Sequence, residues 1–264
     1  MYAFEYQRAK SVGDAAAALA KSGGKALAGG QSLVGAMKLR LANPGTIVDL
    51  GGIAELKGIK KEGDAVVIGA MNTHADVAAS TVVRQAIPAL AAMAEGIGDR
   101  QVRNRGTLGG SLANNDPAAD YPAAVLALGA TVQTNKRKIA ADDFFKGMYE
   151  TALAADEIIT AVSFPIPKKA AYAKFPQPAS RFALVGVFVA HGGGGTRVAV
   201  TGAAASVHRA TMIETALAKS FTADAAKSVK IPPDHLNSDL HGSAEYRAHL
   251  VSVMAARAVA AASR

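Results

Sequence analysis

The sequence predicts an α+β protein whose first part mixes helices with strands and whose second part keeps them apart. Helical and strand patterns alternate as far as residues 164–181, a stretch that holds four prolines. Beyond that stretch, two apolar strands are followed by helices. The prolines therefore mark the expected domain boundary. The chain has 264 residues, 50% of them hydrophobic, which is enough to bury a core on each side of it.

The chain should begin with a helix, a strand, a glycine turn and a second helix. Ser11 and Asp14 resemble a capping box, and Gly23 follows an alanine-rich run as a helix stop. Residues 25–30, "KALAGG", indicate a short buried strand that breaks into a glycine turn. Residues 32–41, "SLVGAMKLRL", then have helical spacing.

Strands and helices continue to alternate through the next part of the chain. Residues 46–50 indicate a buried strand, and residues 58–70 a hairpin that turns at Gly63. Residues 73–97 predict two helical segments separated near Pro88.

A further short helix is expected over residues 120–129. Asp120 would be its N-cap, Pro122 lies in its first turn, and Gly129 ends it. Residues 130–134 then return to strand.

The second part of the chain separates its strands from its helices. Residues 182–191 and 197–205 predict two apolar strands, which the glycines at 192–195 would join as a hairpin. Helices are expected around 208–229 and 243–261.

Composition narrows the classes of function. The 29 Lys and Arg residues exceed the 21 Asp and Glu residues, so the net charge of +8 favours an anionic ligand, an acidic partner or nucleic acid. Trp is absent and aromatic residues make up 5%, so we expect no nucleic-acid partner. Cys is also absent, and any Cys-ligated iron–sulfur cluster would have to belong to a partner chain. No secretory signal or membrane-spanning run is seen, and we expect a cytoplasmic protein.

Two loops with paired glycines are the strongest candidates for a binding site. They are "LAGGQSL" at 27–33 and "TLGGSLAN" at 107–114. Glycine lets successive N–H groups converge on an anion, and a helix that starts there adds positive potential. For one loop alone, a tight turn without a ligand is the favoured interpretation. Together, they could clamp one diphosphate from both sides.

Other sites of chemistry are not indicated. No G-x-G-x-x-G follows a strand, and no P-loop motif occurs. "GQSLVG" misses the nucleophile-elbow pattern, so Ser32 is better interpreted as a helix cap or phosphate ligand. The six histidines lack metal-ligand spacing, and we expect them at the surface or in caps. Asp120 is either a helix cap or a contact to sugar-like hydroxyls. We predict no catalytic residue and no metal ligand.

The sequence resembles the FAD-binding medium subunit of the molybdenum hydroxylases, the group that contains xanthine dehydrogenase and aerobic carbon monoxide dehydrogenase. The resemblance runs nearly from end to end. Its motifs are "FEYQRAKSVGDA", "AGGQSL", "VDLGGIAELKGI", "VIGAMNTHADV", "TLGGSLANNDPAAD", "EIITAVSFPIP" and "GSAEYRAHL".

The resemblance implies an FAD-binding module of the non-Rossmann PCMH type over residues 1–167. That module would have two α/β subdomains, about 1–55 and 56–167, with FAD between them. Residues 168–264 would form an α+β domain of the carbon monoxide dehydrogenase flavoprotein C-terminal type, with a small antiparallel sheet.

The same resemblance implies the cofactor contacts. Backbone N–H groups of both glycine loops would hold the pyrophosphate, Asp120 would contact the sugar-alcohol part of the flavin, and Ile97 aligns with a position that is an aromatic contact in some members. The residues expected to bind FAD are Ala28, Gly29, Gly30, Gln31, Ser32, Leu33, Val34, Thr107, Leu108, Gly109, Gly110, Ser111, Asp120, Ile159 and Lys174.

The implied function is electron transfer. Substrate would be oxidised at a molybdopterin centre on a large partner subunit, and electrons would pass through iron–sulfur clusters on a small subunit to FAD and an external acceptor. We expect a dimer of such heterotrimers. The alternative is a stand-alone FAD-dependent oxidoreductase of the same fold. Neither the substrate nor the acceptor can be derived from this chain.

Overall fold

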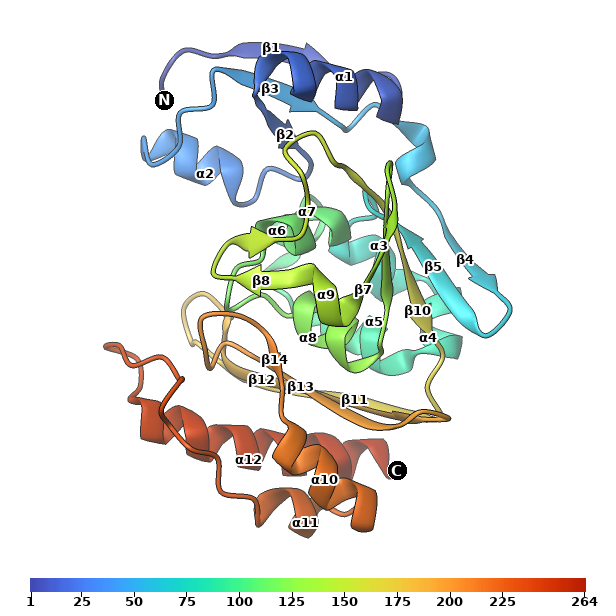
Figure 1. Cartoon of the computed structure of the whole chain (residues 1–264), viewed down its shortest axis with the longest axis vertical. Coiled ribbons are helices and arrows are strands. Elements are labelled where there is room, and N and C mark those ends of the chain that lie inside the picture. Colours follow the sequence, from blue (N-terminus) through green and yellow to red (C-terminus); the bar gives the residue numbers. More distant parts are fainter.

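Three main sheets, each from a different part of the chain, follow one another along the molecule (Figure 1). The structure is a computed structural model and describes residues 1–264. The mixed first part and segregated second part confirm the predicted α+β class. None of its helices is both long and apolar enough to cross a membrane.

The first sheet is parallel and has the order β1-β3-β2. Its elements are β1 (Glu5–Arg8), α1 (Val12–Ser22), β2 (Lys25–Leu27), α2 (Leu33–Lys38) and β3 (Thr46–Asp49). A 3₁₀ turn, η1 (Ala54–Leu56), leads out of it.

Helix α1 has the predicted ends. The Ser11 hydroxyl accepts a hydrogen bond from the Asp14 N–H at 3.0 Å. Gly23 follows the helix with φ +61°, a left-handed conformation that favours glycine. Both ends are set by residues close in sequence, which is why the sequence alone predicts them.

The second sheet is antiparallel and has the order β4-β5-β10-β6-β7. Its strands are β4 (Ile59–Glu62), β5 (Ala65–Gly69), β6 (Thr131–Thr134), β7 (Lys138–Ala140) and β10 (Ile159–Pro165). Gly63 turns the β4–β5 hairpin with φ +55°, as predicted. The helices of this part are α3 (His74–Ala79), α4 (Thr81–Ala86), α5 (Pro88–Glu95), α6 (Arg100–Arg103), α7 (Leu108–Asn114), α8 (Tyr121–Ala127) and α9 (Ala141–Phe144). A small hairpin, β8 (Phe145–Gly147) with β9 (Glu150–Thr151), follows α9.

Residues 73–97 form three helices, so the prediction of two segments is wrong. The additional break lies at Ser80, whose backbone is extended between α3 and α4. Its hydroxyl accepts a hydrogen bond from the Val83 N–H at 3.3 Å and thereby starts a new helix.

The third sheet has the antiparallel order β11-β12-β13-β14. Its strands are β11 (Lys169–Pro176), β12 (Ala183–Gly192), β13 (Gly195–Thr201) and β14 (His208–Arg209). The predicted glycine hairpin joins β12 to β13. The helices α10 (Thr211–Lys219), α11 (Ala223–Lys227) and α12 (Ala244–Ala262) come after the sheet.

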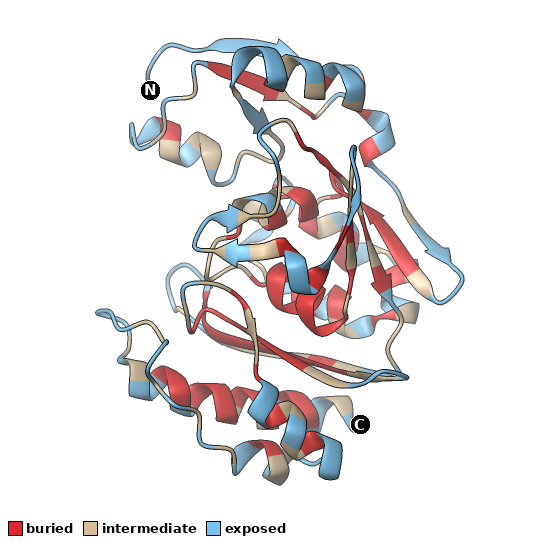
Figure 2. Ribbon diagram, in the orientation of Figure 1, coloured by how far each residue is buried: buried red, intermediate tan, exposed pale blue.

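The third sheet is a middle layer that is buried on both faces. Phe188 and Ala190 of β12 belong to the same hydrophobic core as α8 and the second sheet. Val187 and Val189, which point the other way, pack with α12. Figure 2 shows buried residues on α8, on this sheet and on α12, whereas β1 is exposed. The predicted boundary at 167/168 therefore separates two sheets without dividing their core.

Candidate functional site

The two glycine loops touch each other in the structure. A Cβ built on Gly29 would lie 2.0 Å from the carbonyl oxygen of Arg105. A Cβ built on Gly110 would lie 3.5 Å from the Cβ of Ala28. A non-bonded carbon and oxygen do not approach to 2.0 Å, so the absence of a side chain at Gly29 is what lets the first loop lie against Arg105, which leads into the second loop.

The first loop carries a row of free hydrogen-bond donors. None of the six consecutive N–H groups from Ala28 to Leu33 donates a hydrogen bond within the chain. Gly30 has φ +76°, and the Val34 N–H returns to the Gly30 carbonyl at 3.2 Å, which closes the turn into α2. A half-exposed row of N–H groups on a turn is a place where an anion can bind.

The side chains of this loop are also unengaged. Ser32 stands at the N-cap position of α2, but its hydroxyl caps no N–H. Gln31 and Ser32 are exposed, while Leu33 and Val34 are half-buried at the start of the helix. The capping interpretation of Ser32 is therefore wrong, and its hydroxyl is free for a ligand.

The second loop offers far fewer free donors. The Leu108 and Gly109 N–H groups donate to the carbonyls of Asn72 and Ala70 at 3.0 and 2.8 Å. The Gly110 and Ser111 N–H groups both donate to Thr107, one to its hydroxyl and one to its carbonyl. Of residues 107–111, only Thr107 has an N–H group without a partner in the chain.

This pattern corrects the prediction that the backbone N–H groups of both loops hold the pyrophosphate. Those of the second loop are used by helix α7, which Thr107 caps, and by the end of β5. Gly109 is required by packing, because a Cβ there would lie 2.6 Å from the Ala70 side chain. The second loop thus supports the first and presents a surface without side chains at Gly110.

His74 lies underneath the second loop, contrary to the prediction that all histidines are at the surface or in caps. It is buried, and Gly106 is so close that a Cβ there would lie 2.5 Å from His74 Nε2. Burial, followed by the charge of Arg103, lowers the pKa of His74 to about 4. His74 is therefore neutral near pH 7, and its Nδ1 has no partner in the chain.

Asp120 does not cap α8, which corrects one of its two interpretations. Its backbone is already helical and its side chain makes no capping hydrogen bond. The carboxylate instead accepts the Tyr172 hydroxyl at 2.5 Å and forms an ion pair with Lys174 at 3.0 Å. Burial raises the pKa of Asp120, and Lys174 and Tyr172 oppose that rise. The buried carboxylate is thus tied to β11.

Lys174 also joins this cluster to the segment before α6. Its Nζ donates to the Gly96 carbonyl at 3.0 Å, beside Ile97. Ile97 is half-buried and packs against the main core. The Lys174 side chain is 11% exposed and joins β11 to Asp120, just before α8, and to residue 96.

Ile159 is buried in the main core at the start of β10. The next residue, Thr160, accepts a hydrogen bond from Ala70 at 2.9 Å, and Ala70 in turn accepts the Gly109 N–H. Ile159 is therefore linked to the second loop through Ala70. Helix α7, which contains most of the second loop, packs against β10, and Leu108 of that loop lies in the same buried core as Ile159.

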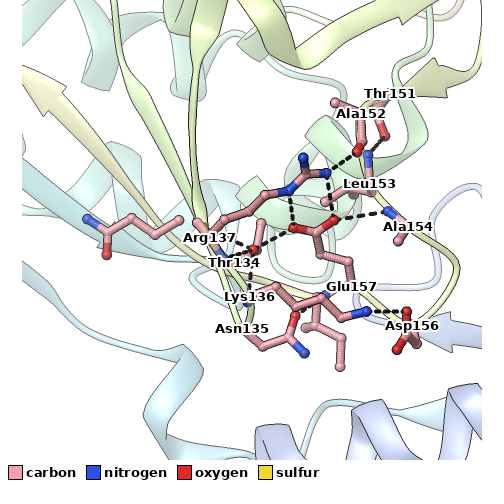
Figure 3. A network of polar contacts seen from close by, with 12 residues as sticks. Thr134, Asn135, Lys136, Arg137, Thr151, Ala152, Leu153, Ala154, Asp156 and Glu157 are labelled. Carbon is pink, nitrogen blue, oxygen red and sulfur yellow. Dashed lines mark hydrogen bonds and ion pairs between the residues drawn. The ribbon is translucent and has the colours of Figure 1, made fainter.

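A polar network fixes the segment that leads into β10 (Figure 3). Arg137 donates twice to Glu157, at 2.9 and 3.0 Å, and Thr134 donates to the same carboxylate at 2.7 Å. The hydrogen bond from Arg137 is the largest influence that lowers the pKa of Glu157, to about 2. Asn135 then accepts the Ile158 N–H at 2.8 Å.

Asn115 and Asp116, which follow helix α7, have structural roles. Asn115 has φ +42° at the end of α7 and donates to the carbonyls of Gly147 and Glu150. Asp116 accepts the Ala118 N–H at 2.9 Å, an Asx turn. The neighbouring Asn114 side chain makes no hydrogen bond in the chain.

Two groups of residues described above suit different ligand chemistries, a diphosphate in one case and hydrogen-bond donors such as hydroxyls in the other. Free N–H groups suit the first, and a buried carboxylate paired with an ammonium suits the second. No cluster of residues suited to a metal ion is present. The fold and the site define a nucleotide-binding protein with no Rossmann motif.

The chain belongs to the family described as FAD binding domain in molybdopterin dehydrogenase, whose family model matches residues 2–167. It is 37% identical to the carbon monoxide dehydrogenase medium chain of Hydrogenophaga pseudoflava, over 98% of this chain and 96% of that one. It is 38% identical to the nicotine 6-hydroxylase medium subunit of Paenarthrobacter nicotinovorans, over 76% of each chain.

Solved structures agree with this assignment. A carbon monoxide dehydrogenase chain from Hydrogenophaga pseudoflava superimposes with a TM-score of 0.89 at 37% identity, covering 99% of this chain and 97% of that one. Quinoline 2-oxidoreductase from Pseudomonas putida 86 gives a TM-score of 0.89 at 31% identity, with the same coverage. The chain is therefore the FAD-binding electron-transfer subunit of a molybdenum hydroxylase, an oxidoreductase, rather than a stand-alone flavoenzyme.

Proposed function

We propose that the chain holds FAD between its first two sheets and passes electrons from iron–sulfur clusters of a small partner subunit to an external acceptor. A large partner subunit would carry the molybdopterin and oxidise the substrate. The assembly would be a dimer of heterotrimers in the cytoplasm. The chain would divide into a FAD-binding domain of residues 1–167, with subdomains 1–55 and 56–167, and a C-terminal domain of residues 168–264.

The observation that carries the cofactor site is the row of six free N–H groups from Ala28 to Leu33. The neighbouring second loop leaves that row open, because Gly110 has no side chain and lies next to Ala28. A diphosphate bound there would accept N–H hydrogen bonds, and the free Ser32 hydroxyl would add another. The net charge of +8 further favours an anionic cofactor.

Asp120 and Lys174 would hold the cofactor further along. The carboxylate can accept hydrogen bonds from sugar-alcohol hydroxyls, and the ammonium group can donate to carbonyl or ring acceptors. Both groups are almost fully buried and fixed by partners, so binding would cost little side-chain ordering. Bound FAD supplies the redox chemistry, and this chain's residues supply its position and surroundings.

The absence of Cys from this chain fits an assembly in which the iron–sulfur clusters belong to other subunits. The relatives carry names that mention carbon monoxide, nicotine and quinoline, so the substrate of this assembly is not assigned.

Purification of the native assembly through a tag on this chain tests the proposal. Mass spectrometry should find two further subunits, one of them rich in Cys, and metal analysis should find molybdenum and iron. The flavin of the isolated chain should stay oxidised with substrate alone and become reduced when the partner subunits are added. Reduction by substrate without partners would contradict the proposal.

A further inference from the structure

The Tyr172 hydroxyl occupies a slot that exists only because residue 186 is glycine. Lys174 of β11 pairs with Gly186 of β12 in the third sheet. A Cβ built on Gly186 would lie 2.2 Å from the Tyr172 hydroxyl oxygen. Any side chain at position 186 would therefore displace that hydroxyl. The tyrosine ring lies beside Phe188, with centroids 6.0 Å apart, so its direction is fixed along its length.

From this position, the Tyr172 hydroxyl reaches Asp120, which directly precedes α8. The two carboxylate oxygens of Asp120 therefore have different hydrogen-bond partners. Oδ1 accepts the Tyr172 hydroxyl at 2.5 Å and lies 3.0 Å from Lys174 Nζ. Oδ2 has only the longer contact to Lys174, at 3.3 Å. Because each carboxylate oxygen has two lone pairs, Oδ2 keeps the greater capacity to accept a further hydrogen bond.

We propose that Tyr172 is a positioning residue for FAD. Gly186 leaves room for the Tyr172 hydroxyl, which fixes Asp120 so that Oδ2 faces the cofactor as a hydrogen-bond acceptor. The inference rests on the proposed cofactor site and adds two residues to it. Tyr172 lies two positions before Lys174 on the same face of β11. One strand thus supplies both groups that hold the carboxylate.

A double-mutant cycle in the full-length chain tests this role. FAD dissociation constants are measured by flavin fluorescence titration of apoprotein for the parent, Tyr172→Phe, Asp120→Asn and the double variant. We expect Tyr172→Phe to weaken FAD binding about ten-fold, the scale of one hydrogen bond to a charged group. In the Asp120→Asn background, the same substitution should change the affinity less than two-fold, since the group that it positions has lost its charge.

The pH profile gives a second readout. The titratable and charged groups that face Asp120 are Tyr172 and Lys174 of β11 and its neighbour Tyr121. The Tyr172 hydrogen bond holds the pKa of Asp120 down, so its loss should move the acid limit of FAD binding to higher pH. Tyr149→Phe is the matched control, because that exposed tyrosine donates to Asp116 at 3.4 Å outside the site.

Gly186→Ala is the second variant, because it keeps the tyrosine but displaces the hydroxyl end of its ring; the new Cβ would lie 2.2 Å from the hydroxyl oxygen and 2.9 Å from both Tyr172 Cζ and Thr201 Cγ2. It should weaken FAD binding like Tyr172→Phe. Unchanged affinity in Tyr172→Phe, or an equal loss in both backgrounds, would overturn the inference by leaving Tyr172 a purely structural role. A parent chain that binds no FAD would instead refute the proposed function.

Discussion

Replacing Gly29 by alanine should force the two glycine loops apart. The new Cβ would lie 2.0 Å from the Arg105 carbonyl oxygen, and real Cβ contacts essentially never fall below 3.0 Å. The gap must therefore open by at least 1.0 Å, the difference between these distances. The opposing atom belongs to the backbone, so no side-chain rotation can relieve the clash.

Gly29→Ala should lower both the unfolding free energy of the chain and its affinity for FAD. Overpacking of this kind costs about 1–3 kcal/mol of unfolding free energy. A displacement of about 1 Å would also misalign the N–H donors, and losing one hydrogen bond to a charged group costs about 1.5–3 kcal/mol, or about ten- to hundred-fold in FAD affinity.

Gly35→Ala is the control for this substitution. Gly35 lies in the same segment, and a Cβ there meets nothing within 4 Å. Its replacement should leave FAD affinity unchanged and stabilise helix α2 by up to about 1 kcal/mol. Fluorescence titration with FAD and urea unfolding measure both quantities. If Gly29→Ala binds FAD as tightly as Gly35→Ala does, the two loops do not form one site.

Two further predictions concern the second loop and the network before β10. Gly110→Val should lower FAD occupancy, because its Cβ would lie 2.8 Å from the Thr107 hydroxyl and fill the surface beside Ala28; unchanged flavin content in the purified variant would contradict this. Glu157→Gln should destabilise the chain at neutral pH by at most about 3.5 kcal/mol, since the carboxyl pKa falls from 4.5 to about 2 on folding and each pKa unit corresponds to about 1.4 kcal/mol. A depressed pKa stabilises the fold above pH 4.5, and this stabilisation is lost as the pH falls towards 2. Urea unfolding should therefore show the difference in unfolding free energy between parent and variant shrinking in acid. A difference that does not depend on pH would show that the charge of Glu157 is not the cause.

The local features of this fold are predictable from sequence because their causes lie within a few residues. Ser11 and Gly23 set the ends of α1, and Gly63 turns its hairpin. The two apolar strands β12 and β13 also follow from their composition and the glycines between them. The break at Ser80 is an exception, because serine in a helical pattern can either continue a helix or cap a new one.

The site itself depends on contacts that the sequence does not show. Asp120 has the pattern of an N-cap, but its partners Tyr172 and Lys174 come from another sheet. The second glycine loop has the composition of an N–H cradle, yet the carbonyls of Asn72 and Ala70 use its donors. The identity of glycine predicts permissive backbone, and only the fold decides which N–H groups remain free.

FAD titration of the purified apo chain tests the central claim most directly. We predict saturation at one FAD per chain, with the flavin absorption band near 450 nm retained after gel filtration. The affinity should fall in Gly29→Ala and remain in Gly35→Ala. A folded chain that takes up no FAD, or that binds it equally in both variants, would contradict the account of the glycine loops as its cofactor site.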